Sequence, residues 1–455
     1  MIEIFTIDTP SLGDRSYLVT DGEVAFVIDP QRDIDRVLQL VDSRYLRLTR
    51  VFETHLHNDY LTGGYALASA TGAEYAIAAG DQVGFDRLPV ADGEAIRVGA
   101  IMSIHAVATP GHTFTHLSYV LKAGGDTRAV FTGGSLLHGS TGRPDLLGDE
   151  HTNELAHAQH RSVQRLAAEL PEETAIYPTH GFGGFCAASE GDTPSGVSTI
   201  AAERQVNAAL RLDEGDYVRG LLPGLDAYPA YYVRMGPRNA SGPEAPDLSP
   251  VAQADAAAIS RRIGDGEWVV DLRSGDRYAA SHLAGTLNFG LDGNFAPYLG
   301  WLIPWGTPVT LLADTVEDIA EAQRELVRIG VDRLAGAATG PAASWGHEGS
   351  RQSFPVTGFK DLAANHGRGD LVVLDVRRRS EWRDAHIEGA VNIPLHELPA
   401  RFADVPPGEV WVHCMTGYRT AIAASVLDRA GRQVVAVRDD FGAAGEAGLT
   451  LVRPA

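Results

Sequence analysis

Short apolar runs and helical apolar stripes follow one another along the first half of the chain. Ser16 to Thr20 and Val24 to Ile28 flank Asp21-Gly22, a pattern that predicts a β-hairpin. Beyond them, apolar residues recur at helical spacing or in short continuous runs. The elements expected from these patterns are helices over 33–43 and 150–169 and strands over 50–53, 129–136 and 175–178. The first half therefore mixes strands and helices.

The second half of the chain contains an internal repeat. Each copy has an apolar run that ends in Asp-x-Arg, a His 11 residues after the Asp, and an Asn 17 residues after it. These residues are Asp271, Arg273, His282 and Asn288 in the first copy and Asp375, Arg377, His386 and Asn392 in the second. Matched residue types at matched spacing predict two related domains in tandem, with these residues as structural ties.

Two stretches that contain Pro and Gly separate the predicted units. Residues 236–250 and 337–357 are interpreted as linkers. A chain of 455 residues is also long for a single domain. We therefore expect three domains, over residues 1–240, 250–345 and 356–455.

A cysteine stands where a predicted strand of the last domain gives way to a helix. Val410 to His413 is a short apolar run and residues 421–430 have helical apolar spacing, so Cys414 lies between a strand and a helix. The loop N–H groups and the helix N-terminus favour an anion there, which makes a thiolate available as a nucleophile. Gly417 lets the loop curl, and Arg419 adds a positive charge at its end. The alternative is a buried structural cysteine.

The first copy of the repeat lacks this chemistry. Alignment of the two copies places Ala313 at the cysteine position and Asp318 at the arginine position. Alanine cannot carry a sulfur atom, and the added carboxylate repels anions. We therefore expect the first copy to be catalytically inert and to act as a spacer or docking surface.

Histidines gather in the first domain at the ends of predicted strands. His55, His57 and Asp59 are three potential ligands within five residues, and His112 and His180 also follow strands at glycine-containing turns. Imidazole and carboxylate at this spacing suit zinc or non-haem iron. The alternative is a set of surface histidines, since the chain has 16. Other histidines of this domain are interpreted as having no metal role, namely His105, His116, His138, His151, His157 and His160.

The loop that begins at Cys414 resembles the active-site loop of rhodaneses, which is Cys-x4-Arg followed by Ser or Thr. The resemblance implies that Cys414 carries sulfane sulfur as a persulfide, with Arg419 as the charged residue of the loop. A loop of this length suits a single sulfur atom, whereas the related phosphatases have one more residue. The residues that would surround that sulfur are Met415, Thr416, Gly417 and Tyr418.

The histidine motifs resemble those of the metallo-β-lactamase fold, closest to its glyoxalase II and persulfide dioxygenase branches. The matching words are Thr-His-x-His-x-Asp at 54–59, Pro-Gly-His-Thr at 110–113, Phe-Thr-Gly at 131–133 and Thr-His at 179–180. The resemblance implies an α/β multidomain protein, an αββα sandwich followed by two α/β rhodanese domains with parallel sheets. Fusion to rhodanese domains favours the persulfide dioxygenases, which use mononuclear non-haem iron and O2 to oxidise a small thiol persulfide to sulfite and thiol.

Two positions depart from the family pattern. Tyr60 replaces the last histidine of His-x-His-x-Asp-His. Gly134 replaces an aspartate that ligates iron in the dioxygenases and bridges two metals in the hydrolases. The resemblance then implies one metal ion, Fe(II) or alternatively Zn, and disfavours a binuclear hydrolase.

The ligands implied for that metal are His55, His57 and His112, while Asp59 and His180 remain at the second metal position. Cys186 follows the His180 loop closely. It is interpreted either as a sulfur carrier beside the metal pocket or as a structural thiol.

Composition and charge narrow the range of partners. The formal net charge is −21 and the pI about 5.1, which argues against nucleic acid and anionic membranes. Two cysteines and the lack of an apolar run of about 18 residues predict a cytoplasmic protein without disulfides or membrane spans. We expect a small thiol persulfide, thiosulfate or sulfite as its small-molecule partners, and the resemblance implies a homo-oligomer.

Three functions stay open from the sequence. The first is a persulfide dioxygenase-like domain coupled to a sulfurtransferase. The second is a metal-dependent thioester hydrolase with an accessory rhodanese, against which Gly134 and Tyr60 argue. The third is a metal-free N-terminal scaffold or oligomerisation module attached to an active rhodanese.

Overall fold

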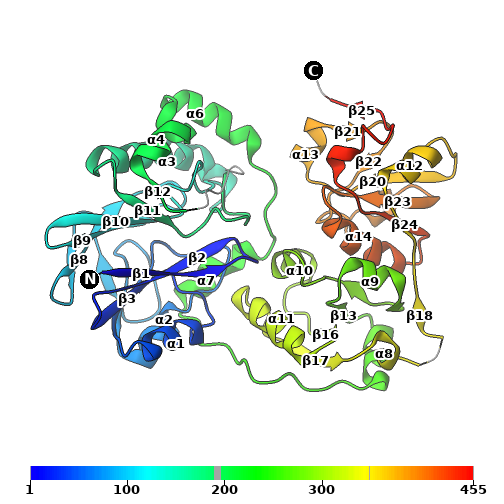
Figure 1. The fold of residues 1–455 in the computed structure, drawn as a ribbon, viewed down its shortest axis with the longest axis horizontal. Coiled ribbons are helices and arrows are strands. Elements are labelled where there is room, and N and C mark those ends of the chain that lie inside the picture. The colour runs from blue at the N-terminus through cyan, green and yellow to red at the C-terminus, as the bar shows by residue number, and fades with distance from the viewer. Residues whose placement is uncertain (1, 189–195, 348, 454–455) are drawn as a thin grey trace. The chain divides into compact units, whose positions relative to one another are not determined.

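The computed structural model describes residues 2–188, 196–347 and 349–453, which divide into two compact units (Figure 1). The first unit is Met1–Asp247 with Val327–Gly330, and the second is Leu248–Leu326 with Val331–Ala455. Within the described residues, no helix combines the length and the apolar character needed to cross a membrane.

The first unit is built on two six-stranded sheets, in the orders β1-β2-β3-β4-β5-β6 and β12-β11-β10-β9-β8-β7. The hairpin around Asp21-Gly22 forms as predicted, with Tyr17 opposite Ile28 in antiparallel register. The strands are β1 (Glu3–Thr9), β2 (Asp14–Thr20), β3 (Val24–Ile28), β4 (Arg47–Phe52), β5 (Glu74–Ala78), β6 (Leu88–Val90), β7 (Ala95–Val98), β8 (Met102–Ala108), β9 (Leu117–Ala123), β10 (Asp126–Gly133), β11 (Ala175–Pro178) and β12 (Ser198–Thr199).

Helices cover the outer face of each sheet of this unit (Figure 1). The inner faces meet in an aromatic core that contains Phe26, Phe52, Tyr119 and Phe131. Burying such rings contributes roughly 1.5–3 kcal/mol each. The helices are α1 (Asp35–Ser43) and α2 (Gly64–Thr71) on the first sheet, α3 (Asp149–Glu169), α4 (Ile200–Val206), α5 (Ala208–Arg211) and α6 (Glu214–Leu221) on the second, and α7 (Tyr232–Ala240). The predicted αββα sandwich is confirmed.

The second unit contains two parallel sheets, one for each copy of the repeat. Their orders are β15-β13-β16-β17 and β19-β24-β23-β20-β22. The first copy contains α8 (Ala256–Gly264), β13 (Trp268–Asp271), α9 (Gly275–Ala280), β14 (His282–Leu283), β15 (Leu287–Asn288), α10 (Phe295–Leu302), β16 (Val309–Ala313), α11 (Val316–Arg328) and β17 (Leu334–Thr339).

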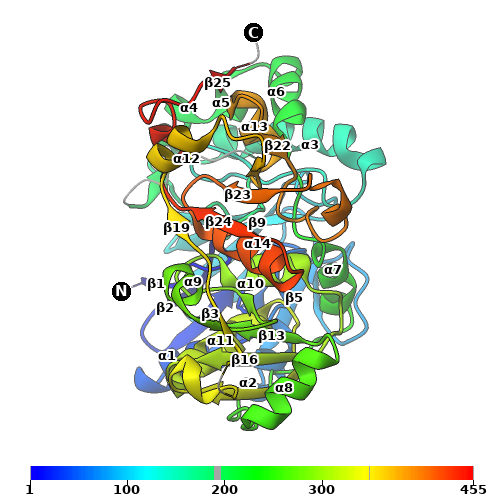
Figure 2. The same cartoon turned by 90° about the vertical axis from the view of Figure 1, so that its right-hand side faces the viewer.

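The second copy repeats this plan around its own sheet. Helix α14 packs against β23 and β24 (Figure 2) and also meets α9 and β15 of the first copy. Its elements are β19 (Val356–Thr357), α12 (Phe359–Asn365), β20 (Leu371–Asp375), α13 (Arg379–Asp384), β21 (His386–Ile387), β22 (Val391–Asn392), β23 (Glu409–His413), α14 (Tyr418–Arg429), β24 (Val434–Val437) and β25 (Leu451–Val452). Strand β18 (Arg351–Gln352) pairs with β14 of the first copy. The predicted α/β class with parallel sheets is confirmed.

The repeated Asp, Arg and Asn residues make the same contacts in both copies. Each arginine donates to its aspartate, at 2.6 Å for Arg273–Asp271 and 2.7 Å for Arg377–Asp375. In the second copy the Asn392 amide donates to the carbonyls of Asp375 and Arg377, both at 3.0 Å. Removing one partner of a buried ion pair costs about 3–5 kcal/mol. These residues therefore tie down the loops at the carboxyl ends of the strands.

Both linker predictions are partly wrong. Tyr232–Ala240 is a helix that includes Gly236 and Pro237, because its Tyr232, Met235 and Asn239 side chains are buried against the first unit. Leu334–Thr339 is a strand, because its small residues fit in the first sheet beside β16. The helix after Cys414 also begins earlier than predicted, at Tyr418 rather than residue 421.

Candidate functional site

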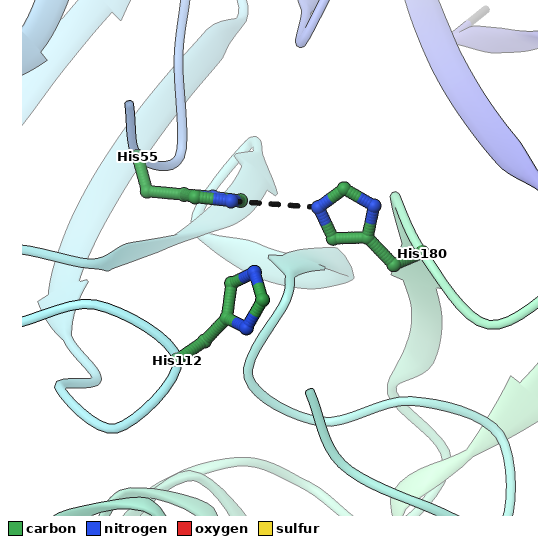
Figure 3. Close-up of side chains that lie close together, drawn as sticks. All are labelled: His55, His112 and His180. Carbon is green, nitrogen blue, oxygen red and sulfur yellow. Dashed lines mark hydrogen bonds between the residues drawn. The ribbon is translucent and has the colours of Figure 1, made fainter. Parts of the chain in front are cut away.

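Three buried histidines converge at one edge of the first unit (Figure 3). His55 follows β4, His112 lies between β8 and β9, and His180 follows β11. One ligand atom from each lies within 4.8 Å of the others, and Nε2 of His55 is 3.4 Å from Nε2 of His180. Strand ends from both sheets thus bring together three imidazoles that are far apart in the sequence.

Hydrogen bonds fix which nitrogen each ring presents to the centre. Nδ1 of His112 lies 2.9 Å from the carbonyl of Arg143, and Nδ1 of His180 lies 2.8 Å from a carboxylate oxygen of Asp14. The Arg143 carbonyl can only accept, so Nδ1 of His112 carries the proton and its Nε2 keeps its electron pair. Such outer contacts orient metal-binding imidazoles in proteins.

His55 is oriented through Thr54 and Asp29. The Thr54 hydroxyl donates to Asp29 at 2.7 Å, so it can only accept from Nδ1 of His55, 2.9 Å away. The Asp29 carboxylate also accepts from the Thr179 hydroxyl at 2.5 Å and therefore links the His55 and His180 loops. Asp29 therefore holds these loops together.

His57 and Asp59 stand beside these three rings. Nε2 of His57 lies 3.0 Å from the Tyr60 hydroxyl and 3.2 Å from Glu53, and its Nδ1 has no hydrogen-bond partner among the described residues. His57, Asp59 and His180 form a second group with ligand atoms within 4.8 Å of one another. Because both groups contain His180, the structure brings together all five of the predicted ligand residues.

The buried nitrogens test whether these residues fit a metal ion. Nε2 of His112 and Nδ1 of His57 are buried and lack hydrogen-bond partners in the described part of the chain. A buried polar atom without a partner costs about 1–3 kcal/mol. A metal ion held by His55, His112 and His180 would satisfy Nε2 of His112, so this group of residues fits one.

Lowered pKa values keep two of the rings in the neutral form, which can bind a cation. Burial and the neighbouring imidazoles lower the pKa of His55, and burial followed by His180 lowers the pKa of His112 to about 3. Both are therefore neutral at pH 7, which is the form that binds metals. Burial would also lower the pKa of His180, but the carboxylates of Asp59 and Asp14 outweigh it and raise that pKa.

Gly134 leaves space that the His112 ring fills. A Cβ atom added at Gly134 would lie 2.2 Å from Cδ2 of His112. The Gly134 N–H donates to Nε2 of His116 at 3.0 Å, and the His116 ring stacks on His55 with centroids 4.9 Å apart. His116 thus supports the cluster from behind without belonging to its ligand groups, a role that sequence spacing did not reveal.

We expect Gly134→Ala to weaken metal binding by about 10-fold and stability by about 1–3 kcal/mol, because its Cβ pushes the His112 ring out of place. Metal content after dialysis and thermal unfolding would measure the two effects. Gly220→Ala is the matched control, since a Cβ there meets nothing within 4 Å. Equal metal retention by both variants would contradict the prediction.

Asn239, in the segment predicted as a linker, holds the loop that carries the histidine motif. The Asn239 amide donates to the carbonyls of His57 and Tyr60 at 2.9 and 2.8 Å and accepts from the Thr62 N–H at 2.9 Å. All three contacts are buried, so this one side chain fixes the loop that carries the histidine motif.

Cys186 lies at the border of the same cluster. It is buried, and burial together with the charges of Asp59 and Asp14 raises its pKa well above the usual value. The protonated thiol is a weak nucleophile. This environment favours a structural thiol over a sulfur carrier.

In the second unit, Cys414 sits directly after β23 at the carboxyl edge of its sheet. The Gly417 N–H points at Sγ of Cys414 from 3.1 Å, and Gly417 has a φ of 102°, a left-handed conformation that favours glycine. The Met415 carbonyl accepts from Phe441 at 2.8 Å, which fixes the other side of the loop. The loop is therefore held in a curled form around the sulfur.

The positive end of the loop has an acidic partner that the sequence reasoning missed. Nη1 and Nη2 of Arg419 donate to the two carboxylate oxygens of Glu381 at 2.6 and 2.7 Å. Glu381 belongs to α13, nearly forty residues earlier in the chain. A Glu six residues after Asp375 was the available signal, but spacing alone does not reveal its partner.

The first copy of the repeat contacts the Cys414 loop directly. Leu312 pairs with Asp271 as His413 pairs with Asp375, so Ala313 occupies the place of Cys414. The hydroxyl of Tyr418 donates to the Gly290 carbonyl at 2.9 Å. The first copy therefore supports the loop whose chemistry it lacks.

We expect Gly293→Ala to lower sulfur transfer at Cys414 by about 10-fold, because its Cβ would lie 2.4 Å from the Tyr418 ring and displace the loop. Steady-state rates with thiosulfate would measure the change. Gly264→Ala, where a Cβ meets nothing within 4 Å, is the control from the same copy. A Gly293→Ala rate equal to the control would show that the first copy does not shape the site.

Comparisons with known proteins cover both units. The profile of the metallo-beta-lactamase superfamily matches residues 14–180, and that of the rhodanese-like domain matches residues 359–443. The persulfide dioxygenase ETHE1 of Homo sapiens is 32% identical over 210 residues, which cover 46% of this chain and 73% of that protein. A hydroxyacylglutathione hydrolase of a Polaromonas species is 29% identical over 231 residues, which cover 45% of this chain and 84% of that protein.

A solved structure extends the likeness over more of the chain. A metallo-beta-lactamase from Staphylococcus aureus subsp. aureus COL superposes with a TM-score of 0.66 at 27% identity, covering 75% of this chain and 99% of that chain. The chain therefore belongs to the metallo-β-lactamase superfamily and carries a rhodanese-like domain towards its C-terminus. The predicted combination of the two is confirmed.

Proposed function

We propose that this protein is an enzyme of sulfur metabolism that carries sulfane sulfur on Cys414 as a persulfide. The observation that supports this most is the curled loop, in which the Gly417 N–H points at Sγ from 3.1 Å in a rhodanese-like domain. The donors are a small thiol persulfide or thiosulfate, and sulfite is a product or acceptor. Cytoplasmic location and a homo-oligomeric state stay predictions.

We further propose that the first unit binds one metal ion. The sequence-based ligand set is His55, His57 and His112, and the close approach of Nε2 of His55 and His180 favours His180 as a further ligand. His57 and Asp59 form a separate ligand group with His180. Fe(II) is the proposed ion and Zn the alternative, supplying Lewis acidity or, for iron, a redox centre for O2 chemistry.

The residues around this centre have roles of their own. Asp14 orients the His180 ring through a hydrogen bond at its Nδ1, and the Thr54 hydroxyl does the same for His55. Because these side chains are buried, they exclude water from the bases of the rings. The substrate proposed for this site is a small thiol persulfide, oxidised to sulfite, by analogy with the human persulfide dioxygenase relative.

The test of this assignment is sulfite formation and O2 uptake by the iron-loaded protein with glutathione persulfide. Turnover of the persulfide without thioester hydrolysis would support it. Thiol release from lactoylglutathione would instead favour the hydrolase. The hydroxyacylglutathione hydrolase relative, 84% of which is covered, supports that alternative, whereas Gly134 argues against it. If neither activity is found, the first unit is a scaffold attached to a sulfurtransferase.

A further inference from the structure

The arginine at the end of the Cys414 loop forms an ion pair with a carboxylate. Arg419 and Glu381 form a two-point ion pair, and their side chains are 11% and 13% exposed. Oε2 of Glu381 also accepts from the N–H of Arg378, the residue just before α13, at 2.9 Å. Two-point pairing of this kind is both strong and geometrically specific. The carboxylate is therefore fixed on the guanidinium rather than sampling solvent.

The pairing changes what the loop can attract. A free guanidinium at this place would bind the sulfonate end of thiosulfate through the same two N–H groups that now contact Glu381. An oxyanion can therefore bind through these two N–H groups only by displacing the carboxylate. A thiol persulfide has no sulfonate group, so its sulfane sulfur can approach Cys414 without breaking the pair.

We propose that Glu381 sets the donor specificity of the Cys414 site by withholding Arg419 from sulfur oxyanions, so that thiol persulfides are the preferred donors. The inference rests on the proposed sulfur transfer at Cys414 and adds a specificity-determining residue to it. In that transfer the Cys414 thiolate attacks the terminal sulfur of R–S–SH. The S–S bond breaks, R–S⁻ leaves with the bonding electrons, and Cys414 keeps the sulfur as –S–SH, with no outside oxidant or reductant.

The charge of Glu381 persists at working pH. Burial would raise its pKa, but the hydrogen bonds and charge of Arg419 outweigh burial and lower that pKa to about 2. The carboxylate is ionised throughout the neutral range. Its competition with oxyanions is thus a constant property of the site.

Glu381→Gln tests the proposal through the ratio of two donors. We expect KM for thiosulfate to fall by about 5–10-fold, while KM for the persulfide of 2-mercaptoethanol changes less than about 2-fold, since only the oxyanion gains a binding partner. Glu397→Gln is the matched control, because Glu397 pairs with Arg379 and Arg401 elsewhere on this domain, at 2.7 and 2.9 Å. Unchanged or raised KM for thiosulfate, or equal changes for both donors, would overturn the proposal.

A binding measurement separates this inference from sulfur transfer itself. In a Cys414→Ser background, which cannot turn over, calorimetry should show tighter sulfate binding with Glu381→Gln than with Glu381 intact. Equal sulfate affinity would overturn the inference even if transfer occurs. Absence of transfer by the unmodified protein would overturn the proposed function while this binding result still decides the role of Glu381. If Glu381→Gln does not fold, Glu381→Asp, which retracts the carboxylate, should change KM for thiosulfate in the same direction, and no change would count against the proposal.

Discussion

Replacing Cys414 with serine should reduce sulfur transfer by at least about 1000-fold, because a hydroxyl cannot form the persulfide that links donor and acceptor. The change is nearly isosteric and leaves the Gly417 N–H able to donate to the new oxygen, so the loop should keep its shape. Thiocyanate formation from thiosulfate and cyanide measures the rate. Mass spectrometry of the unmodified protein after exposure to donor should find the extra sulfur on Cys414.

Cys186→Ser is the control for this loss, because it removes the second of the two cysteines of the chain. Its thiol lies in the first unit, where burial and the charges of Asp59 and Asp14 raise its pKa. Transfer by Cys186→Ser should stay within about 2-fold of the unmodified protein, as expected of a structural thiol. Residual transfer by Cys414→Ser that disappears only in the double variant would identify Cys186 as a second carrier.

Local sequence signals predicted most of the fold. The hairpin around Asp21-Gly22 and the strand Ala175–Pro178 follow from turn residues and apolar runs that act over a few positions. The repeat was readable because Asp271 and Asp375 form the same contacts with residues at fixed spacing. The helix Tyr232–Ala240 was missed because Gly236 and Pro237 disfavour helices locally, whereas burial of its other face stabilises it.

The candidate sites were predictable only where one segment carries the chemistry. The His-x-His-x-Asp run and the Cys414 loop are each continuous in sequence, so their residue types alone suggest a role. His116, Asn239 and Glu381 act through partners about 20 to 180 residues away, on Gly134, His57 and Arg419. Nothing in their neighbours marks them, since such contacts arise from the packing of separate elements.

His112→Ala should remove the metal ion from the first unit, lowering affinity by about 100-fold or more, because it deletes a ligand with a free Nε2 and no adjacent carboxylate replaces it at Gly134. Metal content by plasma mass spectrometry, on protein purified without metal-affinity resin, measures the effect. His105→Ala is the control, since His105 lies on β8 and its ring contacts Ser103. Equal metal content in both variants would place the ion elsewhere.

The identity of the metal in the unmodified protein then decides between chemistries. Stoichiometric iron that is lost in His112→Ala would mean that imidazoles suffice at the position where the family pattern has an aspartate and this chain has Gly134. Persulfide-dependent O2 uptake would then be the next assay. Zinc lost in the same variant would favour the hydrolase, since zinc supplies Lewis acidity without redox chemistry. Protein that stays metal-free after anaerobic Fe(II) loading would show that Nε2 of His112 and Nδ1 of His57, which lack hydrogen-bond partners among the described residues, are tolerated without a cation. In that case sulfur chemistry would be confined to Cys414, and the histidine cluster would be a structural remnant within the metallo-β-lactamase fold.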